Sequence, residues 1–256
     1  MKILRFDELN STNVFLYDKM AEKADISDMV VVAAHQTAGR GMDKNRWESE
    51  AGKNLLFSIA LNVNFLKAEI QFGISQAVSV AVVETLSQFI DSQRLFIKWP
   101  NDIYFGDKKL AGMLIQNTVE GCMMGISIIG IGLNVNQLEF SKEIPNPISM
   151  KQISGKDFEI ENLLNLLVSN IKTKVENLRF EGKRNEINQK YISKSYRFGI
   201  WSDYFYQNQV KQLKINGFDK YGRLLLPDKE GVGIVCDVKE LQFFPPSCRQ
   251  GSEADV

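Results

Sequence analysis

Hydrophobic positions along the chain follow two periods, one typical of helices and one typical of strands. Between Glu69 and Asp91 the apolar residues recur at helical spacing, and between about Glu159 and Leu178 aliphatic residues would line one helix face. Shorter runs rich in valine, isoleucine and aromatic residues predict strands. The predicted helices cover 10–24, 69–91, 159–178 and a shorter segment with Ile187 and Tyr191. The predicted strands cover 3–6, 29–36, 54–63, 94–99, 102–105, 109–119 and 122–136.

The order of these elements predicts two folded parts. Several strands of residues 1–196 follow one another as hairpins, so we expect an α+β domain with a mostly antiparallel sheet flanked by helices. After about Tyr196 the pattern changes to short strands between glycine and aspartate turns, which predicts a small β-barrel over 197–245. The polar residues 246–256 are expected to form a flexible tail.

Composition and charge restrict the possible partners. The chain has 256 residues, 44% of them hydrophobic, and its 31 basic and 31 acidic side chains cancel. Without excess positive charge, neither nucleic acid nor an anionic membrane is an expected partner. Three cysteines without paired spacing and no apolar signal or spanning segment favour a cytoplasmic location. The single histidine, His35, excludes a multi-histidine metal site, so no metal ligands are assigned, whereas Mg²⁺ held by substrate phosphates remains compatible.

The segment 37–53, TAGRGMDKNRWESEAGK, is a candidate binding loop. Structureless loops of this length in compact domains are usually functional. Gly39 and Gly41 flank Arg40, so backbone amides can turn towards an anion beside a guanidinium that suits carboxylate or phosphate. Trp47 adds a stacking surface. The same residues are also compatible with a surface loop in which glycine serves turns and Arg40 is solvated.

The hairpin KWPNDIYFGDKKLAG, residues 98–112, is unusually rich in charge. Asp102 follows a proline bend and can hold a lysine, bind Mg²⁺ or cap a turn. Strict alternation along the returning strand would place Lys109, Ala111 and Met113 on one face. Gly112 is typical of a close approach by a ligand or backbone. The pattern alone leaves Lys109 open between an exposed turn residue and one that projects into a pocket.

Five motifs together resemble those of biotin–protein ligases, also called biotin–[acetyl-CoA carboxylase] ligases or holocarboxylase synthetases. The motifs are STN at 11–13, HQTAGRG at 35–41, KWPND at 98–102, KKLAG at 108–112 and GIGLNVN at 130–136. The resemblance covers the whole chain and implies a class II synthetase-like domain followed by an SH3-like barrel. It implies that biotin and ATP, with Mg²⁺, give biotinyl-5′-AMP and pyrophosphate. The biotinyl group would then pass to a lysine of a biotin carboxyl carrier protein.

The resemblance also implies roles for individual residues. Lys109 and Arg40 would hold the biotin carboxylate and the α-phosphate, and Asp102 would orient or deprotonate the acceptor lysine. The implied biotin-binding residues are Ser11, Thr12, Asn13, Gln36, Gly39, Arg40, Gly41, Met42, Lys109 and Gly112. The implied ATP-binding residues are Arg40, Trp47, Asn101, Lys109 and Asn134.

Two features depart from the family pattern. Relatives often carry arginine or glutamine directly after GRG, then another residue and a glycine, where this chain has Met42, Asp43 and Lys44. We therefore expect only the main chain of Met42 to bind, and Arg40 to carry more of the adenylate retention. STN begins at residue 11, so we expect a monofunctional enzyme without the DNA-binding domain of some relatives.

Two alternatives remain at this point. A lipoate or octanoate ligase of the same fold is disfavoured by Trp99, Pro100 and the loop that ends in Trp47. A non-catalytic biotin-binding module is disfavoured by Lys109 and Arg40. A monomer or weak homodimer is expected, with the carrier protein docking near the site.

Overall fold

The computed structural model describes residues 1–42, 45–238 and 240–244. The chain divides into two compact units, Met1–Tyr196 and Arg197–Val256, and each is described by itself. The tail predicted for 246–256 lies outside the described residues. Within the described part of the chain, no helix is long and apolar enough to cross a membrane.

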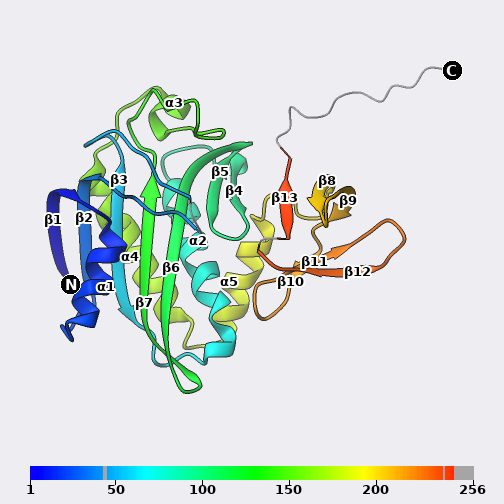
Figure 1. Ribbon diagram of the computed structural model, residues 1–256, viewed down its shortest axis with the longest axis horizontal. Coiled ribbons are helices and arrows are strands. Elements are labelled where there is room, and N and C mark those ends of the chain that lie inside the picture. The colour runs from blue at the N-terminus through cyan, green and yellow to red at the C-terminus, as the bar shows by residue number, and fades with distance from the viewer. Residues whose placement is uncertain (43–44, 239, 245–256) are drawn as a thin grey trace. The chain divides into compact units, whose positions relative to one another are not determined.

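A seven-stranded sheet lies at the centre of the first unit (Figure 1). Its strand order is β1-β2-β3-β7-β6-β5-β4, with β1 and β2 parallel and the other neighbours antiparallel. The strands are β1 (Lys2–Leu9), β2 (Met29–Gln36), β3 (Leu55–Asn62), β4 (Leu95–Lys98), β5 (Asp102–Phe105), β6 (Lys108–Glu120) and β7 (Met123–Leu133). The expected α+β class with a mostly antiparallel sheet is therefore confirmed.

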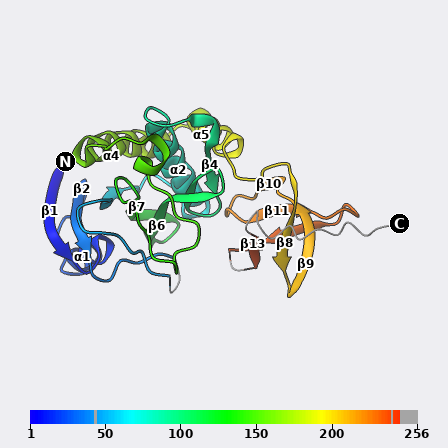
Figure 2. The same ribbon diagram turned by 90° about the horizontal axis from the view of Figure 1, so that it is seen from above.

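Helices cover the two faces of this sheet unequally (Figure 2). On one face, α2 (Phe72–Leu86) packs against α4 (Ile160–Asn177) and α5 (Glu181–Ser193). On the other face, α1 (Thr12–Ala21) contacts β2, β3 and β7, and its Leu16 packs on Val31, Ala60 and Ile128. The segment between β2 and β3 crosses in front of β7 towards β6, on the same face as α1 (Figure 1).

Three short helical segments accompany the predicted helices. Two 3₁₀ turns, η1 (Ala68–Ile70) and η2 (Ser92–Arg94), flank α2, so the predicted helix 69–91 is shorter than expected. The sequence analysis missed α3 (Met150–Ser154). Its signal is a capping box, in which the Ser149 hydroxyl accepts from the Gln152 amide and the Gln152 side chain accepts from the Ser149 amide.

The second unit consists of two three-stranded antiparallel sheets. One has the order β10-β11-β12 and the other β13-β8-β9. The strands are β8 (Trp201–Tyr206), β9 (Gln209–Lys214), β10 (Gly217–Phe218), β11 (Leu224–Pro227), β12 (Gly233–Cys236) and β13 (Leu241–Phe243). Their core contains the fully buried Tyr204, Leu213, Leu224, Leu226 and Cys236. A small β unit was predicted here as a barrel, and the structure has these two sheets, with β13 not predicted.

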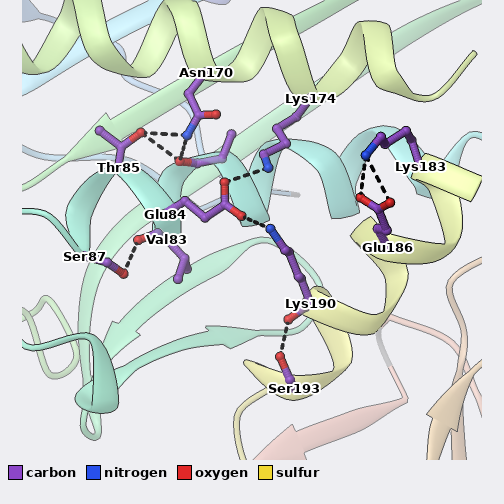
Figure 3. Close-up of polar contacts among 11 residues, drawn as sticks. Val83, Glu84, Thr85, Ser87, Asn170, Lys174, Lys183, Glu186, Lys190 and Ser193 are labelled. Carbon is purple, nitrogen blue, oxygen red and sulfur yellow. Dashed lines mark hydrogen bonds and ion pairs between the residues drawn. The ribbon is translucent and has the colours of Figure 1, made fainter.

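Glu84 on α2 joins the other two helices of its layer (Figure 3). Its carboxylate lies 2.7 Å from Lys174 Nζ on α4 and 2.6 Å from Lys190 Nζ on α5. Burial by itself would raise the pKa of Glu84, but the hydrogen bonds from Lys174 and Lys190 hold that pKa below its ordinary value. The ionised form of Glu84 therefore stabilises the three-helix layer.

Replacing Glu84 by glutamine should lower the free energy of unfolding by about 1 kcal/mol near neutral pH, because two partly exposed ion pairs are lost. Since the pKa of Glu84 is lower in the folded than in the unfolded chain, this contribution is present above the ordinary glutamate pKa. It disappears as the pH falls through the lowered folded-state pKa. Urea denaturation of both proteins across this pH range measures the difference.

The matched control is Glu186→Gln, because Glu186 pairs with Lys183 on the same helix and both side chains are half exposed. The free energy of unfolding of Glu186→Gln should lie within about 0.5 kcal/mol of the wild-type value. A difference between wild type and Glu84→Gln that stays constant at all pH values would contradict this account of the Glu84 ion pairs.

Candidate active site

Polar side chains from α1, β2 and β3 meet at the N-terminal end of α1. The backbone amide of Thr12 donates to Gln36 Oε1 at 2.7 Å, and the Thr12 hydroxyl oxygen lies 3.1 Å from the same atom. The hydroxyl oxygen of Ser58 lies 2.6 Å from Thr12 Oγ1 and 2.5 Å from Asn13 Oδ1. The structure thus brings together three predicted biotin-binding residues and adds Ser58, which the sequence analysis did not select.

Asn13 extends this cluster across the sheet to β6. Its amide nitrogen donates to the Leu114 carbonyl at 3.0 Å and to Gln116 Oε1 at 3.3 Å. The side chain lies directly on Gly130 of β7, where an added Cβ would come closer than 3.0 Å to Asn13 Oδ1. The first glycine of the GIG motif is therefore required because Asn13 occupies the place of its side chain.

Ser11 occupies the N-cap of α1, but its side chain does not cap the helix. The residue is extended, with φ −162° and ψ 135°, and its side chain makes no capping hydrogen bond. Its backbone carbonyl accepts from the Phe15 amide at 3.0 Å. Because Ser11 is only 4% exposed and its hydroxyl is not used by the helix, it is suited to a ligand at this end of α1.

The predicted open loop contains a short hairpin. The amide of Gly41 donates to the Asn45 carbonyl at 2.8 Å, and the amide of Trp47 donates to the Gly39 carbonyl at 3.0 Å. An added Cβ at Gly39 would lie 2.5 Å from the Trp47 carbonyl oxygen. Gly39 is thus explained by close backbone pairing, and the Gly41 amide, expected to face an anion, is used within the hairpin.

Arg40 lies opposite Arg46 on this hairpin, and both residues are exposed. Gly39 pairs with Trp47, so alternation sends Arg40 to the hairpin face opposite the Trp47 side chain. Within the described residues, Arg40 has no side-chain hydrogen bond or ion pair. The sequence predicted that Arg40 and Lys109 would act on the same groups, but among the described residues no contact joins their side chains. Met42 is half-buried in the turn, and the following residues 43–44 lie outside the described part.

The Trp47 indole lies on two glycines of the sheet. Gly112 of β6 pairs with Gly132 of β7, and added Cβ atoms there would meet the indole at 3.0 Å and at less than 3.0 Å, respectively. The ring centroid is 5.7 Å from Lys109 Nζ. The buried indole nitrogen has no hydrogen-bond partner among the described residues. Trp47, which was predicted to lie near the adenine, thus lies beside Lys109 on the surface formed by Gly112 and Gly132, which we call the glycine floor.

Lys109 forms an ion pair with Asp102, with 2.8 Å between Lys109 Nζ and Asp102 Oδ1. The strict alternation expected for Lys109, Ala111 and Met113 is wrong. The register between β5 and β6 shifts, since Asp102 faces Gly112 whereas Tyr104 faces Lys109. A bulge of this kind re-aims side chains, and it places Lys109 Nζ 3.4 Å from the position of a Gly112 Cβ.

The two asparagines predicted on the ATP side are bound to the backbone. Asn101 Nδ2 donates to the Met113 carbonyl at 2.5 Å. Asn134, which is 4% exposed, donates to the Ile148 carbonyl at 3.1 Å. Both side chains therefore hold strand ends at the site, and their contact with a nucleotide stays a prediction.

Three features thus lie on one sheet face: the polar cluster at α1, the indole of Trp47, and the Lys109–Asp102 ion pair. The sequence analysis missed Ser58 and Gln116. A signal for Ser58 exists, because it is the one polar residue within the otherwise apolar run LLFSIAL, residues 55–61. Gln116 is an exposed strand residue and carries no comparable signal.

Solved structures with the same fold include biotin protein ligases. A biotin protein ligase from Aquifex aeolicus in complex with biotin and ATP superposes with a TM-score of 0.75 and 26% sequence identity, over 94% of this chain and 97% of that one. The bifunctional ligase/repressor BirA of Escherichia coli is 27% identical over 234 residues, which cover 88% of this chain and 68% of that protein. The biotin–[acetyl-CoA-carboxylase] ligase of Mycobacterium tuberculosis is 32% identical over 132 residues, 51% of this chain and 48% of that protein.

The model of the biotin/lipoate A/B protein ligase family matches residues 5–134, just over half of the chain. The chain belongs to this family. The resemblance inferred from the five motifs is thereby confirmed, since the proteins named above include a biotin protein ligase and a biotin–[acetyl-CoA-carboxylase] ligase.

Proposed function

We propose that the protein is a biotin–protein ligase, which activates biotin with ATP to biotinyl-5′-AMP and transfers the biotinyl group to a lysine of a biotin carboxyl carrier protein. The observation that carries this proposal is the hydrogen-bonding polarity of the cluster at α1. The Thr12 backbone amide donates to Gln36 Oε1, so the amide nitrogen of Gln36 is the group left to donate. Both amide hydrogens of Asn13 are engaged, so its oxygen is the group left to accept.

Such a site suits a cyclic urea, which offers one carbonyl acceptor and two N–H donors. The dithiolane ring of lipoate and the alkyl chain of octanoate offer neither. Bound there, they would leave the polar groups of Gln36 and Asn13 unpaired, and sites built for hydrogen bonding reject such analogues strongly. The cluster therefore favours biotin over the other acids that this family's name covers.

Lys109 is proposed to act in the first half-reaction. A carboxylate oxygen of biotin attacks the α-phosphorus while the bond to pyrophosphate breaks, and negative charge grows on the phosphate oxygens. Lys109, beside Trp47 and at the rim of the glycine floor, is placed to neutralise that charge. The Arg40 side chain lies on the hairpin face opposite the Trp47 side chain. Arg40 would therefore assist only after this hairpin has moved.

Asp102 is proposed to act in the second half-reaction. When Lys109 turns to the adenylate, its ion pair with Asp102 opens and exposes a carboxylate. That carboxylate can orient the ammonium group of the acceptor lysine and take its proton. The neutral amine then attacks the acyl carbon, and the bond to AMP breaks.

Mg²⁺ is proposed to accompany ATP. This ion usually binds through one or two carboxylates together with substrate phosphates. Among the described residues no cluster of three or more candidate ligands exists, but Asp102 supplies one partly exposed carboxylate at the site. The residues present therefore fit an ion held mainly by the nucleotide, which would help neutralise its phosphates.

The name of one relative supports the proposed acceptor. One relative is a biotin–[acetyl-CoA-carboxylase] ligase, so a carboxylase carrier domain is the proposed acceptor. We further propose that residues 1–196 are the catalytic domain and 197–245 an SH3-like accessory domain. The protein would act in the cytoplasm as a monomer or weak homodimer.

ATP–pyrophosphate exchange tests this function. We expect exchange of labelled pyrophosphate into ATP with biotin, and at least about a hundredfold slower exchange with lipoate or octanoate at equal concentration. Exchange that is supported equally by octanoate would instead favour a lipoate-type ligase. Biotin binding without any exchange would favour a non-catalytic biotin-binding module.

A further inference from the structure

We propose that Ser58 is a positioning residue that holds Asn13 Oδ1 and Thr12 Oγ1 in place at the biotin head-group site. This inference rests on the proposed function. Ser58 lies on β3, an interior strand of the sheet, is fully buried, and is the one polar side chain in the run 55–61. A buried hydroxyl in such surroundings is unfavourable unless it is hydrogen-bonded, and Ser58 reaches two members of the cluster, Thr12 and Asn13.

The Ser58 hydroxyl has one proton, and Asn13 Oδ1 can only accept. The 2.5 Å contact between them therefore directs the Ser58 proton to Asn13. On its other side, Asn13 donates to the Leu114 carbonyl at 3.0 Å and to Gln116 Oε1 at 3.3 Å. A flipped amide would turn its oxygen towards the Leu114 carbonyl, which can only accept, so this contact sets the direction of the Asn13 amide and Ser58 holds its oxygen.

The fixed amide determines what the site offers to a ligand. Asn13 Oδ1 has two lone pairs, and Ser58 uses one of them, so one acceptor position remains. Because the Ser58 proton goes to Asn13, the 2.6 Å contact between Ser58 and Thr12 Oγ1 uses the Thr12 proton, and Thr12 holds Gln36 Oε1 through its backbone amide. One buried hydroxyl thus connects the acceptor of the site, on Asn13, with the donor of the site, on Gln36.

The test is Ser58→Ala, assayed by biotin-dependent ATP–pyrophosphate exchange. Without the hydroxyl, Asn13 Oδ1 and Thr12 Oγ1 lose their shared partner and are held less firmly, and we expect the KM for biotin to rise about tenfold, the ratio that 1.4 kcal/mol represents. The kcat at saturating biotin and the KM for ATP should stay within about twofold. A purely structural role for Ser58 would lower the active fraction and kcat while leaving the KM for biotin unchanged.

Ser127→Ala is the matched control. Ser127 is also a fully buried serine, on the neighbouring strand β7, and its hydroxyl has no hydrogen-bond partner among the described residues. Both KM values should equal those of the wild type. Ser58→Cys keeps the size and a weaker donor, so its KM for biotin should lie between those of the wild type and Ser58→Ala.

A second variant avoids the buried strand. Gln116 is exposed, so Gln116→Ala should fold normally, and loss of one Asn13 contact should raise the KM for biotin about threefold. Unchanged KM values in both Ser58→Ala and Gln116→Ala, with normal wild-type exchange, would overturn the positioning role alone. Absence of biotin-dependent exchange in the wild type would overturn the proposed function, and this inference with it.

Discussion

Lys109→Ala is expected to slow biotinyl-5′-AMP formation by at least about a hundredfold, because a preorganised charge at a developing oxyanion is typically worth that much. The structure places this charge where the bulge between β5 and β6 turns it to the glycine floor beside Trp47. Exchange of labelled pyrophosphate into ATP at saturating biotin measures the loss directly. Since Asp102 loses its ion-pair partner in this variant, thermal unfolding should be recorded alongside.

Lys108→Ala supplies the control for Lys109→Ala. Lys108 precedes Lys109 on β6, carries the same charge and is exposed at the turn. Its exchange rate should stay within about twofold of the wild type, because an exposed charge outside the site contributes little. Equal exchange rates in Lys108→Ala and Lys109→Ala would remove Lys109 from the chemical step.

Gly130→Ala should weaken biotin binding more than tenfold. An added Cβ would come closer than 3.0 Å to the oxygen and the carbon of the Asn13 side-chain amide, and would lie 3.0 Å from its nitrogen. Asn13 is held by β3 and β6 and has nowhere to move without losing the contacts to Ser58 or Leu114. Overpacking of this kind costs about 1–3 kcal/mol, and calorimetric titration with biotin reads out its effect on the site.

Gly233→Ala is the comparison for Gly130→Ala. Gly233 also lies in a strand, β12, but nothing lies within 4 Å of an added Cβ there. Biotin affinity should equal that of the wild type. If Gly130→Ala binds biotin as tightly as Gly233→Ala does, Asn13 is not part of the head-group site.

Local pattern predicted most of the main sheet, because strands such as Met29–Gln36 and Leu55–Asn62 carry strong apolar runs. Elements that depend on a few polar contacts were harder to predict. The five-residue helix α3 begins at a capping box that periodicity does not register. The segment around Arg40 was predicted to be an open loop. Residue spacing alone does not indicate the close contact between Gly39 and the Trp47 carbonyl, which joins the two arms of the hairpin.

At the site, motifs predicted which residues gather, but not how they face. Thr12, Asn13 and Gln36 do form one cluster. Ser58 joins them only because β3 lies between β2 and β7, which is a property of the sheet order rather than of any motif. Lys109 was assigned to the wrong face because a bulge inserts one residue into β6, and strict alternation has no means of including it.

Mass spectrometry of a biotin carboxyl carrier domain tests the central claim most directly. The domain would be incubated with the protein, Mg²⁺, ATP and either biotin or lipoate, with a carrier whose acceptor lysine is changed to arginine as control. We predict one added biotinyl group, on the acceptor lysine, when both ATP and biotin are present, and none on the control carrier. An unmodified carrier in the complete mixture, or one modified equally well by lipoate, would contradict the assignment of this protein as a biotin–protein ligase.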